Sequence, residues 1–225
     1  PEEQLIGIRN YLDPILKTQQ YKTKQYMEDD FKKENIFILE YKELNERQKV
    51  WINNYFTTAI FPILTPLAVD PSHPFPFISN LSLNLAAIIV DSESDKEQFT
   101  RIKIPGESIS RFISIPIELH DNESTKYTGI AIEQIIANNL SMLFPGMSVK
   151  EYSFFRVTRD ADLELRDLEA DDLMSALEEG LRKRRKGGEV VRLEVSTNTP
   201  KVILDLLQEG MNIDKENLYQ IEGLL

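Results

Sequence analysis

The two histidines of this chain are candidates for covalent phosphoryl transfer. His73 stands in a Ser-His-Pro-Phe-Pro stretch, and His120 stands in a polar loop. A phosphoacceptor histidine must present a ring nitrogen in line with the phosphate, with cations nearby to neutralise the developing charge. Neither histidine has a basic neighbour in the sequence. The pattern therefore favours a histidine bonded within a rigid turn or at an interface for His73, with a phosphoacceptor as the alternative, and a surface histidine for His120.

A second set of charges comprises Arg156, Arg159, Asp160 and Asp162. Arg159 could contact a phosphate, because a guanidinium group binds phosphate oxygens in a bidentate way. Alternatively, the arginines and aspartates pair with one another and fix a corner where a strand leaves the sheet. The neighbouring acids favour this second interpretation, because they offset the positive field that a phosphate needs. Asp160 to Glu164 lacks the glycine and turn residues of a tight oxygen-ligand loop, so no metal site is predicted.

Arg182 to Lys186 is a basic run at the end of a predicted helix over residues 170–181. Acidic residues between positions 167 and 172 stand at the start of that helix, an arrangement that the helix dipole favours. This pattern predicts a solvated helix end, with a polyanion-binding patch as the alternative. Gly187-Gly188 indicates a helix stop and a turn rather than a glycine-rich phosphate loop.

The composition restricts the classes of partner. A net charge of −11, from 37 acidic and 26 basic residues, argues against nucleic acid and other polyanions, which need clustered lysines and arginines. The lack of cysteine excludes disulfides, thiolate catalysis and cysteine-ligated metals, and it fits a cytoplasmic protein. No apolar run is long enough to predict a transmembrane segment. Because residue 1 is proline, we expect the chain to be part of a longer protein.

The elements that must position these residues follow from hydrophobic periodicity. Residues 2–33 form a predicted helix with a kink or break at Asp13-Pro14, and residues 46–60 form a second, deeply buried helix. Further helices are predicted over residues 132–143, over residues 170–181, and from Pro200, with Thr199 as the cap. Strands are predicted over residues 36–39, 82–90, 99–104, 148–158, 190–195 and 218–221.

Strand alternation also predicts which side chains are buried. In the strand over residues 148–158, we expect Tyr152, Phe154 and Phe155 to be buried. Four charged residues are expected to face solvent, namely Arg101, Lys103, Arg192 and Glu194.

Helices and strands are mixed without a regular strand–helix–strand rhythm. This predicts an α+β fold with a mixed, mostly antiparallel sheet and packed helices. A helical arm over residues 1–35 is expected to precede one α+β domain over residues 36–225, with the boundary near Asn35.

Residues 61–85 contain five of the eleven prolines, together with Phe61, Phe75 and Phe77. Proline fixes φ and removes a backbone donor, so this segment cannot form a regular helix or a central strand. The segment is too apolar for a solvated linker, which predicts a rigid, extended segment held against a folded body by its aromatic rings. Stiffly displayed aromatic rings suit an interface. The candidate interface residues are His73, Phe75, Phe77 and Asn80.

Residues 61–85 resemble a signature of the long bacterial polyphosphate kinases, the type that forms a phosphohistidine intermediate. The resemblance covers most of the chain and is loosest over residues 1–35 and 90–130. Three further stretches resemble the same family in the same order: 139–147 (NLSMLFPGM), 155–163 (FRVTRDADL) and 169–173 (EADDL).

The resemblance implies that the chain comprises the end of a helical N-terminal domain and the middle, or head, domain. In this family the whole enzyme transfers the terminal phosphate of ATP reversibly to polyphosphate, with Mg²⁺. The head domain supports dimer formation and helps to wall the tunnel to the active site. The family's catalytic histidines and phosphate-binding arginines lie beyond the present C-terminus, and its contact to the ATP base lies ahead of Pro1. The resemblance therefore implies no catalytic, cofactor-binding or metal-binding residue in this chain.

The implied partners are the remaining domains of the parent enzyme and a second copy of it, in the cytoplasm or associated with a membrane. His73, Phe75, Phe77 and Asn80 become candidates for the dimer interface or the tunnel wall. Two alternatives stay open: a free-standing protein-interaction module, and a phosphotransferase that depends on His73.

Overall fold

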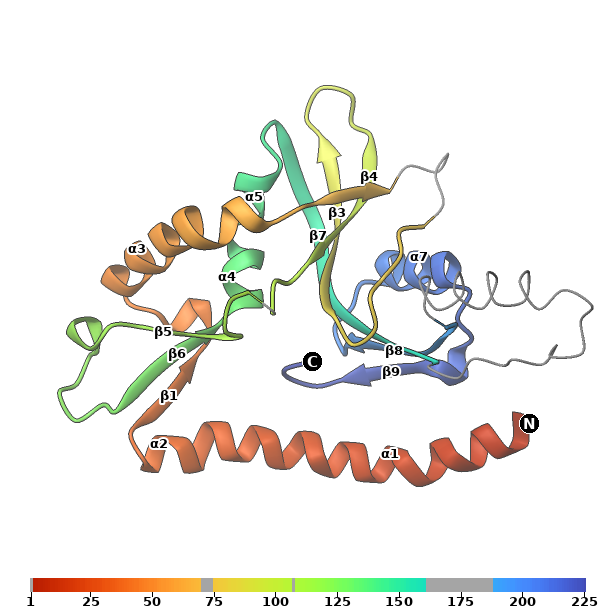
Figure 1. The fold of residues 1–225 in the computed structure, drawn as a ribbon, viewed down its shortest axis with the longest axis horizontal. Coiled ribbons are helices and arrows are strands. Elements are labelled where there is room, and N and C mark those ends of the chain that lie inside the picture. The colour runs from red at the N-terminus through yellow and green to blue at the C-terminus, as the bar shows by residue number, and fades with distance from the viewer. Residues whose placement is uncertain (1, 70–74, 107, 161–187) are drawn as a thin grey trace, which may run out of the picture.

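The structure, a computed structural model, describes residues 2–69, 75–106, 108–160 and 188–225 (Figure 1). Several sequence predictions lie outside these residues. They are the helix over residues 170–181, the basic run from Arg182 to Lys186, and the side chains of His73 and Asp162.

The larger sheet has six strands in the order β2-β4-β3-β7-β8-β9. Neighbouring strands are antiparallel except β8 and β9, which run parallel. The short strand β2 lies at one edge, as expected for a proline-rich segment that cannot supply a central strand. The strands are β2 (Leu67–Val69), β3 (Leu83–Asp91), β4 (Glu97–Lys103), β7 (Met147–Arg159), β8 (Val190–Ser196) and β9 (Leu218–Ile221).

The smaller sheet has three strands in the order β1-β6-β5, namely β1 (Ile36–Leu39), β5 (Phe112–Ser114) and β6 (Tyr127–Ala131). Strand β6 pairs parallel with β1 and antiparallel with β5. The predicted α+β class with mostly antiparallel strands is therefore confirmed.

The helices are α1 (Glu2–Gln25), α2 (Phe31–Lys33), α3 (Glu46–Tyr55), α4 (Ile132–Asn138), α5 (Leu140–Leu143) and α7 (Lys201–Met211). Two π-helical turns, Tyr26–Asp30 and Phe56–Ile60, follow α1 and α3 directly. In the described part of the chain, no helix combines the length and the apolar character needed to cross a membrane.

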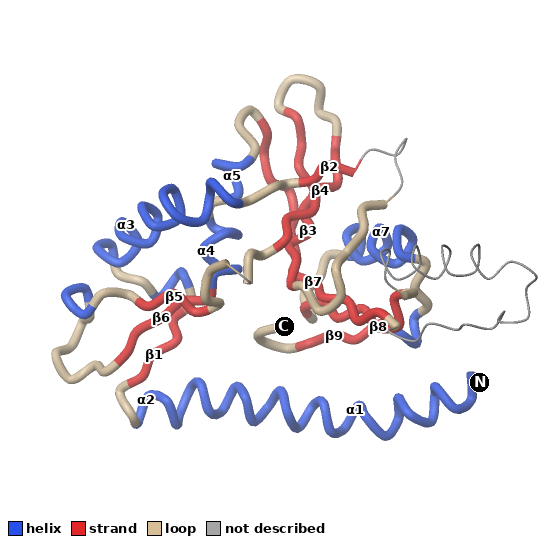
Figure 2. Tube along the Cα trace, in the orientation of Figure 1, coloured by secondary structure: helices blue, strands red, loops and turns tan. Residues whose placement is uncertain are grey.

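Strand β3 separates two hydrophobic cores. Leu85 and Ala87 face the first core, which contains residues of α3, α4 and the smaller sheet. Ala86 and Ile88 face the second core, which contains residues of β7, β8 and α7. Burial on both faces explains why the sequence of β3 is a nearly continuous apolar run. Figure 2 shows α7 lying against the larger sheet while α3 and α4 lie toward the smaller one.

Helix α1 runs along both sheets and continues through Pro14 (Figure 1). Of the kink or break predicted at this proline, the break is therefore wrong. Proline removes one backbone donor and crowds the carbonyl group one turn earlier. Contacts on both sides of it hold the helix to the body. Arg9 Nη1 donates to Glu216 O at 2.6 Å, and Gln20 Oε1 accepts from Glu222 N at 3.1 Å. These contacts hold both halves of the helix against the body.

Two charged residues that were predicted to face solvent are buried. Arg101 and Glu194 are each 6% exposed, while Lys103 and Arg192 are half-buried. Strand β4 lies inside the sheet with both faces covered, and the polar face of β8 lines a cleft beneath α1. Alternation gives the period of a strand, but it does not say whether a second layer covers the polar face.

Strand β7 buries Phe155 as predicted, and Phe154 is half-buried, but Tyr152 is 44% exposed. Residues three apart in a strand point to opposite faces, so Tyr152 and Phe155 cannot share one core. Tyr152 instead packs edge-on against Phe154, with ring centroids 6.0 Å apart. The prediction that Tyr152 is buried is therefore wrong.

Thr199 does not cap α7, contrary to the prediction. Its hydroxyl donates to Ser196 O at 2.6 Å and lies 2.6 Å from Ser153 Oγ. Pro200 directly precedes the first helical residue, and no side-chain cap bond is formed. The Thr199 hydroxyl thus ties the chain to β7 and β8 before the helix begins.

Candidate functional site

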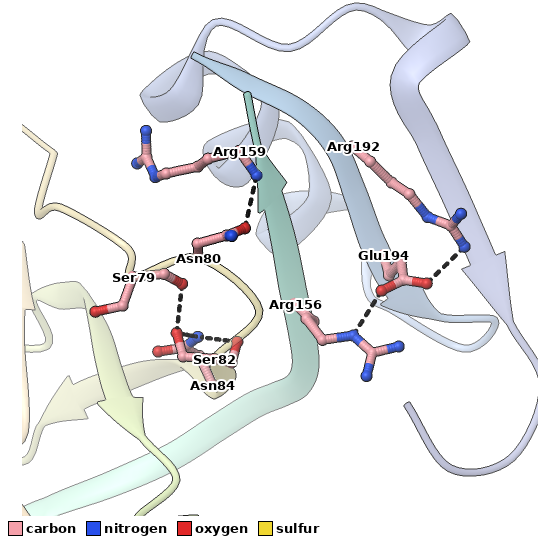
Figure 3. Close-up of polar contacts among 8 residues, drawn as sticks. All are labelled: Ser79, Asn80, Ser82, Asn84, Arg156, Arg159, Arg192 and Glu194. Atoms are coloured by element: carbon pink, nitrogen blue, oxygen red, sulfur yellow. Dashed lines mark hydrogen bonds and ion pairs between the residues drawn. The ribbon is translucent and has the colours of Figure 1, made fainter. Parts of the chain in front are cut away.

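Two candidate segments that are far apart in the sequence meet at the end of β7. The Asn80 side chain accepts a hydrogen bond from Arg159 N at 2.8 Å (Figure 3). Arg159 Nε donates to Ile78 O at 2.7 Å, and Nη1 donates to Gly188 O at 2.8 Å. The guanidinium group also lies over the ring of Phe77, 4.3 Å from its centroid. We call Phe77, Asn80 and Arg159 the arginine corner.

These contacts bear on the two interpretations of Arg159. Two of its N–H groups are bonded to main-chain carbonyl groups, and one face of the guanidinium lies over an aromatic ring. Partial burial lowers the pKa of Arg159 from its usual value. The geometry fits the interpretation in which Arg159 fixes a corner of the fold. Arg159 does so by donating to main-chain carbonyl oxygens of the neighbouring loops.

The candidate interface residues do not all lie at the surface. Phe77 is 50% exposed, and Asn80 is exposed as well. Phe75 packs against the second core, where its ring centroid lies 5.8 Å from that of Phe99. A side chain at Gly210 would collide with the Phe75 ring, so this position requires glycine. Phe75 is therefore a packing residue, and Phe77 and Asn80 form the exposed part of the segment.

His120 is half-buried in its loop. Its Nε2 atom lies 3.0 Å from Ile115 O, so this nitrogen carries the proton and donates. The Nδ1 atom is buried and has no hydrogen-bond partner among the described residues. These contacts fit a histidine that helps to hold its loop.

A buried acid with two arginine partners was missed by the sequence analysis. Glu194 Oε2 accepts from Arg156 Nε, and Glu194 Oε1 accepts from Arg192 Nη2, each at 2.6 Å (Figure 3). We call these three residues the carboxylate triad. The guanidinium groups of Arg192 and Arg9 lie 4.1 and 3.8 Å from the ring centroid of Tyr219. This set of contacts links β7, β8, β9 and α1.

The family model for the polyphosphate kinase middle domain matches residues 47–225. The chain belongs to the polyphosphate kinase family. The resemblance noted in the sequence is thereby confirmed. Polyphosphate kinases of Prochlorococcus marinus (strain MIT 9313) and Thermosynechococcus vestitus are 53% and 47% identical to the whole chain, which covers 32% and 30% of their lengths. The chain thus spans about a third of the length of these polyphosphate kinases.

A solved structure supports the fold. The crystal structure of polyphosphate kinase from Porphyromonas gingivalis aligns with all of this chain at a TM-score of 0.72, with 21% sequence identity. The chain covers 32% of that structure. The α+β arrangement is therefore an architecture that also occurs within the longer polyphosphate kinase of Porphyromonas gingivalis.

Arg101 forms a second buried polar contact in this chain. Its Nε donates to Asn84 Oδ1 at 2.7 Å, and Asn84 Nδ2 donates to Ser82 O at 2.8 Å. Burial lowers the pKa of Arg101 from its usual value. The signal that could have revealed this contact is an asparagine inside an otherwise apolar strand, because a buried amide needs partners.

Arg111 and Glu133 form a third buried contact. Arg111 Nε and Nη2 both donate to Glu133 Oε1, at 3.0 and 2.6 Å, and the Glu133 side chain is 4% exposed. No cluster of three or more potential metal ligands is found among the residues that the structure describes. The buried polar groups described so far connect strands and helices to one another.

The first prediction tests the arginine corner. Arg159→Lys is expected to lower the free energy of unfolding by about 1–2 kcal/mol. Lysine cannot keep both hydrogen bonds to the carbonyl groups of Ile78 and Gly188 together with the stacking on Phe77. Urea unfolding of the 1–225 chain measures the loss. Arg47→Lys is the control, since Arg47 Nη2 makes an exposed bond to Glu118 O at 3.2 Å, and about 0.5 kcal/mol or less is expected. Equal losses in the two variants would contradict the role of the corner.

Proposed function

We propose that this chain is a non-catalytic scaffold within a polyphosphate kinase. In this proposal, residues 1–35 form a helical arm and residues 36–225 form the middle, or head, domain. The whole protein transfers the terminal phosphate of ATP reversibly to polyphosphate, with Mg²⁺. The names of the relatives and the one-third coverage of their lengths support this assignment. The bond-making groups then belong to parts of the parent outside these residues.

One observation carries the scaffold role. Every arginine in the described part of the chain donates at least one hydrogen bond to another group of the protein. Arginines that take part in phosphoryl transfer point their guanidinium groups at the charge developing on the phosphate. Here these groups join strands, loops and helices instead. The arginines are Arg9, Arg47, Arg101, Arg111, Arg156, Arg159 and Arg192.

The exposed part of the proline-rich segment is the proposed contact with the rest of the enzyme. Phe77 is half exposed and is braced from one side by Arg159, so it can be buried by a partner with little loss of side-chain freedom. We assign Phe77 and Asn80, with His73 from the same segment, to the dimer interface or to the tunnel wall. The partners are a second copy of the parent and its remaining domains, in the cytoplasm.

The test uses the full-length polyphosphate kinase with His73→Ala and Phe77→Ala combined. We expect the dimer to dissociate about tenfold more readily, with reduced turnover, because an aromatic anchor is removed. Sedimentation equilibrium and polyphosphate formation provide the two measurements. Phe75 stays unchanged because it packs inside the fold, and Tyr152→Ala is the control for an exposed aromatic residue on the same domain. Unchanged dimerisation and unchanged turnover would exclude the proposed contact.

The excised 1–225 chain tests the non-catalytic assignment directly. With labelled ATP and Mg²⁺, it is expected to form no polyphosphate and to retain no label. Polymer formation by this chain would overturn the scaffold role. Label that is retained by the chain and lost in His73→Ala would instead establish a His73-dependent phosphotransferase.

A further inference from the structure

A cleft lies between α1 and the two sheets. Figure 2 shows α1 running beneath β1 and β9. Its volume is about 780 Å³, which is within the usual range of small-molecule sites. Residues of α1 line one side, and residues of β1, α4, β7 and β8 line the other. Helix α1 and both sheets therefore contribute residues to the lining of the cleft.

The charge of the cleft is unevenly distributed. Near β8 and β9, the carboxylate triad combines two guanidinium groups with one carboxylate and carries a net positive charge, and Glu222 lies 3.4 Å from Lys24. Near β1 the lining is mainly acidic, with Lys32 as its basic member. The acidic residues there are Glu28, Asp29, Glu40, Glu43 and Glu133. Of these, Glu40 pairs with Lys42 and Glu133 pairs with Arg111, so the acids still outnumber the bases. The field at this end attracts cations, in keeping with the net charge of −11.

Glu133 has one carboxylate oxygen without a hydrogen-bond partner among the described residues. Its side chain is 4% exposed, and both hydrogen bonds from Arg111 go to Oε1. Oε2 is buried and has no partner within the described residues. A buried carboxylate oxygen without a donor is costly, and such atoms in native proteins are usually satisfied. The terminal torsion of glutamate is broad, so a small rotation can present Oε2 to a group in the cleft.

The rest of the lining suggests what carries the missing donor. Apolar side chains from α1, the π-helical turn after it, β1 and β7 provide a hydrophobic floor beside the acids: Leu16, Met27, Phe37, Leu39 and Phe154. A bare metal ion would not use this floor, and the described residues contain no cluster of three potential metal ligands. An alkyl chain with a cationic end would use both the floor and the acids.

We propose that this cleft binds a linear aliphatic diamine or polyamine. One ammonium group donates to Glu133 Oε2, the alkyl chain lies along Phe37 and its apolar neighbours, and a second ammonium group meets Glu28 and Asp29 on the π-helical turn after α1. The site is separate from the arginine corner and does not depend on the proposed scaffold role.

The experiment measures binding of diaminopentane to the full-length polyphosphate kinase by calorimetry. Pentylamine and pentanediol serve as matched probes that lack one or both ammonium groups. We expect diaminopentane to bind more tightly than pentylamine, and pentanediol to show no binding. Equal affinity for the three probes, or no binding of diaminopentane, would overturn the proposal.

Variants locate the site. Glu133→Gln is expected to weaken the binding of diaminopentane about tenfold, since it removes the charge that accepts the first ammonium group. Glu28→Gln combined with Asp29→Asn is expected to weaken it several-fold, and this double variant decides the question if Glu133→Gln does not fold. Glu97→Gln is the control, because Glu97 pairs with Lys150 outside the cleft. Unchanged affinity in a folded Glu133→Gln variant and in the double variant would reject the site.

Discussion

Phe155→Ala is expected to lower the free energy of unfolding by about 4 kcal/mol, the largest effect of any single substitution proposed for this chain. Phe155 is fully buried in the second core. It lies at the centre of the larger sheet, where it pairs with Asn84 on β3 and with Val195 on β8. Removing the ring leaves a cavity between the sheet and α7, and rigid strands on both sides limit its collapse.

Urea unfolding of the 1–225 chain measures this loss, with Tyr152→Ala as the matched control. Both residues are aromatic and lie on β7, but Tyr152 is 44% exposed. The control is expected to cost about 1 kcal/mol or less. A similar loss in the two variants would show that the assignment of faces on β7 is wrong.

Glu194→Ala is expected to cost about 2–3 kcal/mol. The carboxylate is 7% exposed, and its removal leaves the guanidinium groups of Arg156 and Arg192 close together without an anion. These two side chains are 32% and 26% exposed, so water screens part of their repulsion, and the expected loss is below the 3–5 kcal/mol of a fully buried pair.

Chemical unfolding at low and high salt measures the contribution of the carboxylate triad. Glu194→Gln keeps the shape and loses the charge, so it is expected to fall between the wild type and Glu194→Ala. Glu34→Ala is the surface control, because Glu34 and its partner Lys126 are both exposed, and about 0.5 kcal/mol or less is expected. A loss in Glu194→Ala no larger than in Glu34→Ala would show that the triad does not stabilise the fold.

Much of the fold could be predicted from local patterns. The apolar run of β3, the alternation in β8 and the helical spacing in α3 each depend on a repeat within a few residues. The errors occurred where a distant part of the chain changes the environment. Glu194 follows the pattern of a solvent-facing residue, but its face of β8 lines the cleft beneath α1. Pro14 follows the pattern of a helix break, but α1 continues through it, and contacts with residues 216 and 222 hold both halves of α1 against the body.

In the candidate site, too, local patterns predicted some features and contacts between distant residues decided the others. The sequence singled out Phe77, Asn80 and Arg159 for their chemistry, from two separate stretches. Their contact depends on Asn80 and Arg159 meeting across 79 residues of chain, which no local pattern encodes. The same applies to Phe75, which looks like its neighbour Phe77 in the sequence but packs into the second core over Gly210.

The sequence by itself determined the family, the α+β class and most strand positions, because motifs and periodicities are properties of consecutive residues. The tertiary structure alone decided which charged groups are buried and with which partners, and which aromatic residue stays at the surface. The physical reason is that burial and pairing depend on the second layer placed over each face. That layer comes from residues far away in the chain, as α1 does for Glu194 and as Asn80 does for Arg159.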